Sequence, residues 1–101
     1  MLLTKRFTIT ISKAALGDIE IAKFYYDEQL EGLGKRFTYQ VKSSINKLST
    51  HPYFQVRYKN IRCAPVSKFP FLIHFSVNDA KKAIEIFAII HTAKNPETYH
   101  Q

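Results

Sequence analysis

The sequence predicts an α+β fold of two layers, in which a helical hairpin packs on a mainly antiparallel sheet. Apolar residues alternate with polar ones near the N-terminus, recur every three or four positions in the middle, and alternate again in the second half. We therefore expect the order β-α-α-β-β-β, with a three-strand meander at the end. The length of 101 residues suits a single domain covering residues 1–101.

The N-terminal segment is expected to form the first strand. Its odd-numbered and even-numbered positions differ in polarity: threonines and Arg6 alternate with the apolar residues Leu3, Phe7, Ile9 and Ile11. A period of two places one side of a strand on a core and the other toward solvent. The position of this strand in the sheet does not follow from the sequence.

The first helix is expected to begin after Ser12, whose side chain suits an N-cap. Spacings of three and four residues give this helix one apolar face, formed by Ala15, Ile19, Ala22, Tyr26 and Leu30. The sequence Gly32-Leu33-Gly34 should break the helix.

A second helix should then run to about Ser49, where His51-Pro52 ends it, because the residue before a proline avoids the α region. Its buried stripe is expected to consist of Phe37, Val41, Ile45 and Leu48. Two helices with so short a break form a helical hairpin.

The second half returns to strand patterns. The candidates are the short segments Gln55 to Tyr58 and Ile61 to Ala64, the alternating segment Phe71 to Val77, and Ala83 to His91. Asn78-Asp79 supplies a turn between the last two. The last segment is apolar on both parities except at Glu85, which is typical of a central strand buried on both faces.

Positive charge is concentrated in the second part of the chain. Fifteen Lys and Arg against eight Asp and Glu give a net charge of +7. Residues 1–34 carry four basic and five acidic side chains, a net of −1, whereas residues 35–101 carry eleven and three, a net of +8. Such a field attracts polyanions: nucleic acid, a ribosome or an acidic peptide.

Several classes of protein are disfavoured. No stretch approaches the ~20 apolar residues of a membrane span, and the first residues lack the apolar block of a signal peptide. Cys63 is the only cysteine, which excludes an intrachain disulfide and a cysteine-based zinc site. The sequence carries no phosphate-binding glycine loop and no nucleophile signature. We expect a cytoplasmic protein without membrane contact, cofactor or metal.

Three segments resemble one toxin family. Phe24 to Gln29, followed by Gly32 to Phe37, resembles the helix–break–helix signature of the ParE-like plasmid-stabilisation branch of the RelE/ParE superfamily. Phe69 to Phe75 resembles its third strand, and Ile89 to Pro96 resembles its closing strand, which ends in a histidine and a basic loop. The resemblance covers about residues 7–99.

This resemblance implies the toxin of a bacterial type II toxin–antitoxin system, which inhibits growth and is neutralised by a cognate antitoxin in a toxin–antitoxin hetero-oligomer. Members of the superfamily differ in their targets. RelE-like toxins cut mRNA on the ribosome, whereas ParE-like toxins inhibit DNA gyrase. Because one fold can host both activities, the site has to decide between them.

The nuclease interpretation requires a proton acceptor, a proton donor and cations around one phosphate. The side chains of these types are Arg57, Lys59, Arg62, His74, His91, Lys94, Tyr99 and His100. RelE-like nucleases carry arginines where this chain has Phe71-Leu72 and Thr92-Ala93. Losing two phosphate clamps removes roughly 2–4 kcal/mol each from transition-state stabilisation. Enzyme activity therefore stays open, and binding is favoured.

The binding interpretation needs only a surface. Phe24 and Tyr25 lie off the main stripe of the first helix, and further aromatic residues are expected in loops or short strands: Tyr53, Phe54, Tyr58 and Phe69. Those that are exposed together form a patch suited to an antitoxin or a target. Those that pack beneath loops serve the fold.

The sequence thus predicts a toxin that binds an essential macromolecule such as DNA gyrase. The alternatives are a metal-independent, ribosome-dependent mRNA endoribonuclease, an inactive homologue that only binds antitoxin, and a nucleic-acid-binding module without toxicity. The residues expected to contact the target or the antitoxin are Arg57, Lys59, Arg62, His91, Lys94 and Tyr99.

Overall fold

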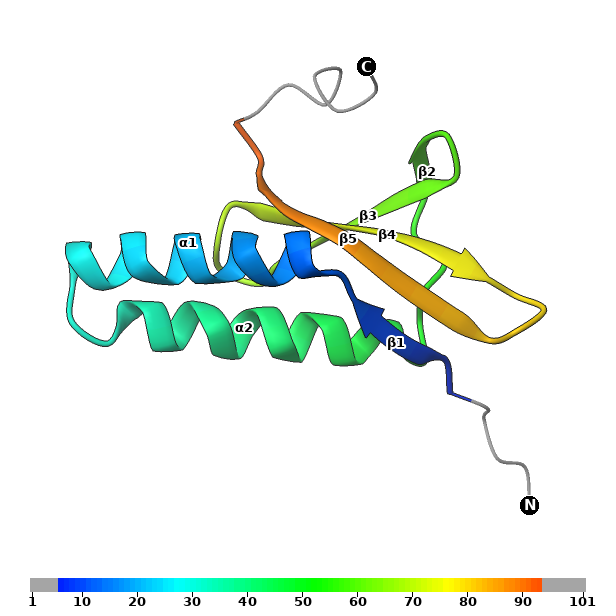
Figure 1. Cartoon of the computed structure of the whole chain (residues 1–101), viewed down its shortest axis with the longest axis horizontal. Coiled ribbons are helices and arrows are strands. Elements are labelled where there is room, and N and C mark those ends of the chain that lie inside the picture. The colour runs from blue at the N-terminus through cyan, green and yellow to red at the C-terminus, as the bar shows by residue number, and fades with distance from the viewer. Residues whose placement is uncertain (1–5, 94–101) are drawn as a thin grey trace.

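The computed structural model describes residues 6–93. The elements in chain order are β1 (Thr8–Ile11), α1 (Lys13–Gln29), α2 (Leu33–Leu48), β2 (Val56–Tyr58), β3 (Ile61–Pro65), β4 (Phe71–Asn78) and β5 (Ala83–His91). The two helices run side by side as a hairpin, and the strands form one sheet next to them (Figure 1). The α+β fold and the expected order are confirmed, and the candidate at 55–58 adds the short edge strand β2.

The sheet has the order β1-β5-β4-β3-β2. Strands β2 to β5 pair antiparallel with their neighbours in sequence, whereas β1 pairs parallel with β5, from Thr8 opposite Ala83 to Ile11 opposite Ile86. Parallel neighbours need a long crossover, which the helical hairpin and the meander supply. The first strand, whose place the sequence left open, is therefore an edge strand beside the last one.

The junction between β1 and α1 is capped as the sequence predicts. The side chain of Ser12 accepts the Ala15 N–H at 3.0 Å, and its hydroxyl donates to the Phe87 carbonyl at 3.1 Å. One serine thus caps α1 and ties it to β5. At the other end the prediction for Leu30 was wrong. The helix ends at Gln29, so Leu30 is its C-cap and its side chain is 60% exposed.

The break between the helices depends on Gly32, whose φ of 88° lies in the left-handed region. The carboxylate of Asp27 accepts the Gly34 N–H at 2.8 Å, which satisfies one of the free donors at the start of α2. The hairpin is therefore fixed by local backbone chemistry.

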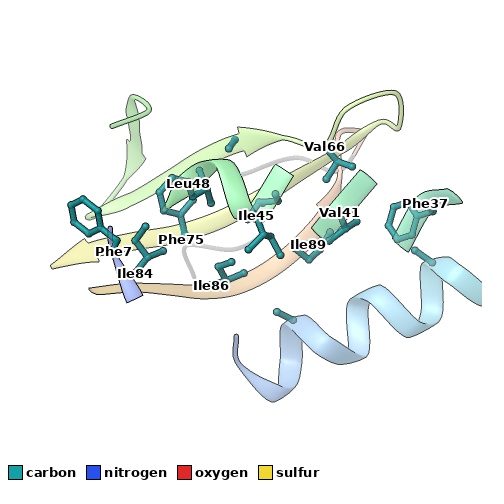
Figure 2. Packing of buried hydrophobic residues seen from close by; sticks show 14 residues of the cluster. Phe7, Phe37, Val41, Ile45, Leu48, Val66, Phe75, Ile84, Ile86 and Ile89 are labelled. Atoms are coloured by element: carbon teal, nitrogen blue, oxygen red, sulfur yellow. The ribbon is translucent and has the colours of Figure 1, made fainter. Parts of the chain in front are cut away.

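The core lies between the helical hairpin and one face of the sheet. The buried stripe of α2 is the one predicted, Phe37, Val41, Ile45 and Leu48, and it meets buried side chains of β4 and β5 (Figure 2). From α1 only the small residues Ala15 and Ala22 are fully buried. Most of the hydrophobic stabilisation from the helices therefore comes from α2.

Strand β5 contains a bulge at Phe87. Phe75 pairs with Ile86 and His74 with Ala88, so Phe87 has no partner in β4. The predicted burial of β5 on both faces holds only on the helix side, where Ile84, Ile86 and Ile89 are buried. On the opposite face Ala88 and Ile90 are half-buried, because both helices pack on the same side of the sheet.

Candidate functional site

The face of the sheet opposite the helices carries a polar cluster around His74. The Tyr58 hydroxyl lies 2.9 Å from His74 Nδ1, and Cys63 Sγ lies 3.6 Å from the same atom. Cys63 and His74 are opposite each other in the β3–β4 ladder. Although His74 is on the face without helices, its side chain is only 3% exposed. The sequence marked this histidine, but its enclosure depends on β2 and β3 folding beside it.

The electrostatics of this cluster favour uncharged groups. Burial lowers the pKa of His74, the nearby Arg57 cation lowers it further, and Asp18 opposes the shift. Burial raises the pKa of the Cys63 thiol, and Arg57 opposes that shift. The imidazole and the thiol are therefore neutral at neutral pH. An enclosed, neutral histidine cannot reach a substrate, so this cluster stabilises the sheet.

The cationic residues predicted for the β2–β3 hairpin face different ways. Arg57 and Lys59 are exposed, and Lys59 occupies the tight turn with a φ of 48°. Arg62 pairs with Phe75, whose side chain is in the core, and its guanidinium donates to the Phe54 carbonyl at 2.6 Å. That guanidinium also lies 5.5 Å from the centre of the Tyr53 ring. Arg62 thus stabilises the loop before β2.

His91 lies toward the opposite end of the sheet. It pairs with Phe71, whereas Arg62 pairs with Phe75, four positions further along β4. At ~3.3 Å per residue this separates them by roughly 13 Å along the strand. His91 Nδ1 accepts the Ala93 N–H at 3.0 Å. The described candidates therefore do not form one catalytic cluster. Lys94, Tyr99 and His100 lie outside the described residues.

Three aromatic residues named for a possible surface contact other parts of the fold, although Tyr53 is 58% exposed and Phe54 is 38% exposed. Phe69 contacts Tyr26 and Phe37, with ring centres 5.0 Å and 5.2 Å apart. The Tyr53 hydroxyl donates to Asp79, a bond that raises the pKa of Tyr53. Phe54 packs edge-on against Phe75. These rings hold loops in place.

A stripe of exposed apolar side chains follows the outer side of α1. Ile21 is 73% exposed, Phe24 68% and Tyr25 57%. Phe24 and Tyr25 lie three and four positions after Ile21, which places the three residues on one side of the helix. We call these three residues the α1 stripe. The sequence pointed to Phe24 and Tyr25 but missed Ile21, which the same spacing could have found.

The α1 stripe continues into a hollow at the end of β5. Because β1 ends at Ile11, opposite Ile86, none of the strands within residues 6–93 covers the β5 edge beyond the bulge. Asp18 instead accepts the Ile89 N–H at 3.0 Å. The hollow, of about 430 Å³, is lined by Asp18, Ile21, Phe71, Ala88, Ile89, Ile90 and His91. Ile21 therefore links the stripe to the hollow. We call the two together the α1–β5 surface.

Residues 6–93 contain no group of three His, Cys, Asp or Glu side chains arranged to hold a metal ion. Over the same residues, neither helix has the length and apolar composition needed to cross a membrane.

Sequence comparisons identify no relative, since no protein-family model and no curated protein matches the chain. Solved structures do match. A chain of the chromosomal ParDE toxin–antitoxin system from P. aeruginosa superposes with a TM-score of 0.76 at 14% identity, over 86% of this chain and 97% of that one.

Two further structures are similar. The isolated E. coli RelE toxin gives a TM-score of 0.63 at 10% identity, over 91% of this chain and 90% of that one. The toxin–antitoxin complex RelBE2 from Mycobacterium tuberculosis gives 0.62 at 14% identity, over 91% and 98%. At these identities the likeness is one of fold.

Proposed function

From the premise that this chain has the RelE/ParE toxin fold, we propose that it is the toxin of a bacterial type II toxin–antitoxin system. The single observation that carries the proposal further is the exposed α1–β5 surface. Exposed apolar side chains do not contribute to the hydrophobic core. A contiguous apolar patch on the surface of a small protein marks a place where another protein binds.

The chemistry of the α1–β5 surface suits an antitoxin segment. Phe24 and Tyr25 are residues of the kind enriched in protein interfaces. The hollow beside Ile21, at the edge of β5 beyond the bulge, offers an extended peptide a place for an apolar side chain. His91, one of the predicted contacts, borders this hollow. We propose that the antitoxin neutralises the toxin by covering this surface.

Binding of a macromolecular target, such as DNA gyrase, is the mode of action that the site favours. Among residues 6–93, His74 is buried beside the half-buried Tyr58, and Arg62 is held by the Phe54 carbonyl. At the strand position where RelE-like nucleases carry an arginine, Leu72 is half-buried and has no charge. Arg57 and Lys59 remain exposed on the hairpin, and we propose that they contact the target in the cytoplasm.

Controlled expression of the full chain tests this function. We expect growth to stop, plasmid supercoiling to fall and transcripts to stay intact, and co-expression of the gene beside it to restore growth. The variant Arg57→Gln/Lys59→Gln should weaken the arrest, whereas the matched variant Lys13→Gln/Lys81→Gln, at exposed lysines elsewhere, should not.

Each alternative gives a different outcome. Transcripts cut on ribosomes with normal supercoiling would replace the binding mode with mRNA cleavage. Normal growth with a bound product of the neighbouring gene would indicate an inactive homologue. Normal growth without any such partner would overturn the toxin proposal.

A further inference from the structure

The outer face of α2 is rich in cations. The helix contains Lys35, Arg36, Lys42 and Lys47 and no Asp or Glu. All four side chains are exposed, because the opposite side of the helix carries the buried apolar stripe. The positive charge that the sequence places after residue 34 thus begins on this helix.

The cations lie on both flanks of one exposed strip. At 100° per residue, Lys35 and Lys42 are on the flank toward α1, and Arg36 and Lys47 are on the other. Tyr39, whose side chain is 67% exposed, lies between the flanks. Lys35 and Lys42 are seven residues apart, about 10 Å along the axis at 1.5 Å per residue. We call these four cations and Tyr39 the α2 face.

The C-terminal half of the α2 face borders a hollow of about 510 Å³. Its lining includes the cations Arg6, Lys42 and Lys47 together with Tyr39, Ser43 and Asn46, and it includes no carboxylate. The hollow between the two helices differs, because Asp27 and Glu31 line it beside its lysines. An anionic ligand is therefore favoured in the hollow at the C-terminal half of α2 over the hollow between the helices.

The side chains of these cations form no ion pair that ties them to the rest of the described fold. Within residues 6–93, none of the side chains of Arg6, Lys35, Arg36, Lys42 and Lys47 makes an ion pair. A negatively charged partner would complement this arrangement.

We propose that the α2 face binds the sugar–phosphate backbone of a nucleic-acid duplex. This goes beyond the proposed function, because it adds a second surface with a different kind of partner. Contacts to phosphate and sugar come from Lys, Arg, Ser, Asn and Tyr side chains, which are the residue types around this hollow. Tyr39 is the single large apolar side chain exposed there.

The same composition disfavours a protein partner for this face. The centres of protein interfaces are depleted of lysine and enriched in apolar and aromatic residues. The α1 stripe has that composition, whereas the α2 face has its opposite. Attraction to phosphates by rows of lysine and arginine is also independent of base sequence, so the surface is expected to bind without sequence preference.

Fluorescence anisotropy of the full chain with labelled DNA and RNA duplexes, each of about 20 base pairs, tests the proposal across a range of salt concentrations. The variant is Lys42→Gln/Lys47→Gln, and the matched control is Lys13→Gln/Lys81→Gln. All four positions are exposed, so circular dichroism should show each variant folded.

We expect at least one duplex to bind, with an affinity that falls steeply as salt rises. Each phosphate contact contributes about 0.9 to the slope of log K against log salt, so the α2 variant should lower that slope by roughly 2. Its affinity at about 0.1 M salt should be at least tenfold weaker. The control should match the unmodified chain.

Three results overturn the proposal. Neither duplex binds at about 50 mM salt, or the variant and the control weaken binding equally. In the third, a glutamate-rich peptide with the same total charge as a duplex binds the α2 face more tightly than both duplexes. That result would assign the face to an acidic protein. None of these results affects the growth test of toxicity.

Discussion

The two helices are neighbours of almost equal length, 17 and 16 residues, yet they distribute their side chains in opposite ways. Helix α2 turns its large apolar residues inward and its cations outward. Helix α1 buries only alanines completely, and it exposes Ile21, Phe24 and Tyr25. The core explains the apolar residues of α2 but leaves those of the α1 stripe unexplained. The lesson is that function is best sought where exposure contradicts residue type.

The two helices also differ in what surrounds their glycines, Gly34 in α2 and Gly17 in α1. A Cβ atom built on Gly34 would lie 2.5 Å from the Lys23 carbonyl oxygen and 2.7 Å from the Asp27 carboxylate. The start of α2 therefore touches the backbone of α1 directly. Gly17, in the middle of α1, has open space in place of a Cβ. The same residue type is required at one position and dispensable at the other.

The largest expected effect breaks the contribution of α2 to the core. Phe37 is fully buried and packs against Tyr26, Phe69 and Phe71. Phe37→Ala should lower the free energy of unfolding by about 3–5 kcal/mol, because it leaves a cavity among these rings. Phe24→Ala, on the exposed side of α1, should change it by less than about 0.5 kcal/mol. Urea denaturation measures both, and similar losses would contradict this division of roles.

A smaller effect comes from the contact between the helices. Gly34→Ala should destabilise the chain by roughly 1–3 kcal/mol, because the Lys23 carbonyl is backbone and cannot move aside freely. Gly17→Ala should instead stabilise it by about 0.5–1 kcal/mol, since alanine loses less conformational freedom than glycine in a helix. Melting temperatures of the two variants should shift in opposite directions. A rise in the melting temperature of Gly34→Ala would show that the helices are not in close contact there, and a fall for Gly17→Ala would show that this position is not open.

A drop in pH should destabilise the fold through the sheet. Neither α1 nor α2 contains a histidine that would become protonated. The pKa of His74 is lowered in the folded chain, chiefly by burial. Below its unfolded pKa of about 6.5 the unfolded chain binds more protons, so stability should fall as the pH drops. The melting temperature of the unmodified chain should therefore fall between about pH 7.5 and pH 5.5, and that of His74→Gln should fall less. If the melting temperatures of the two proteins fell equally over this pH range, His74 would not be the cause of the pH dependence.

The parts of the fold that depend on neighbouring residues follow from the sequence. Ser12 caps α1 as expected, and the buried stripe of α2 has the predicted members, because both patterns are set within a few helical turns. The parallel pairing of β1 with β5 could not be predicted, since it joins residues about 75 positions apart along the chain. Strand order depends on how separate elements pack, which periodicity does not record.

The candidate site was less predictable than the fold. Residue type marked Arg62 and His91 as contacts, but the ladder separates them, and Arg62 is held by the Phe54 carbonyl. The enclosure of His74 depends on Tyr58 and Cys63, which come from other strands. A single sequence shows which side chains are chemically suitable. It does not show which of them the sheet brings together.

The α1 stripe as the antitoxin contact is tested most directly by matched exposed aromatic residues. Phe24 on α1 is 68% exposed and Tyr39 on α2 is 67% exposed. Calorimetric titration with the protein encoded beside this chain should show Phe24→Ala weakening binding by about 2 kcal/mol, roughly 30-fold, while Tyr39→Ala leaves the affinity unchanged. Full affinity in Phe24→Ala, or a loss confined to Tyr39→Ala, would contradict the assignment of a protein partner to α1.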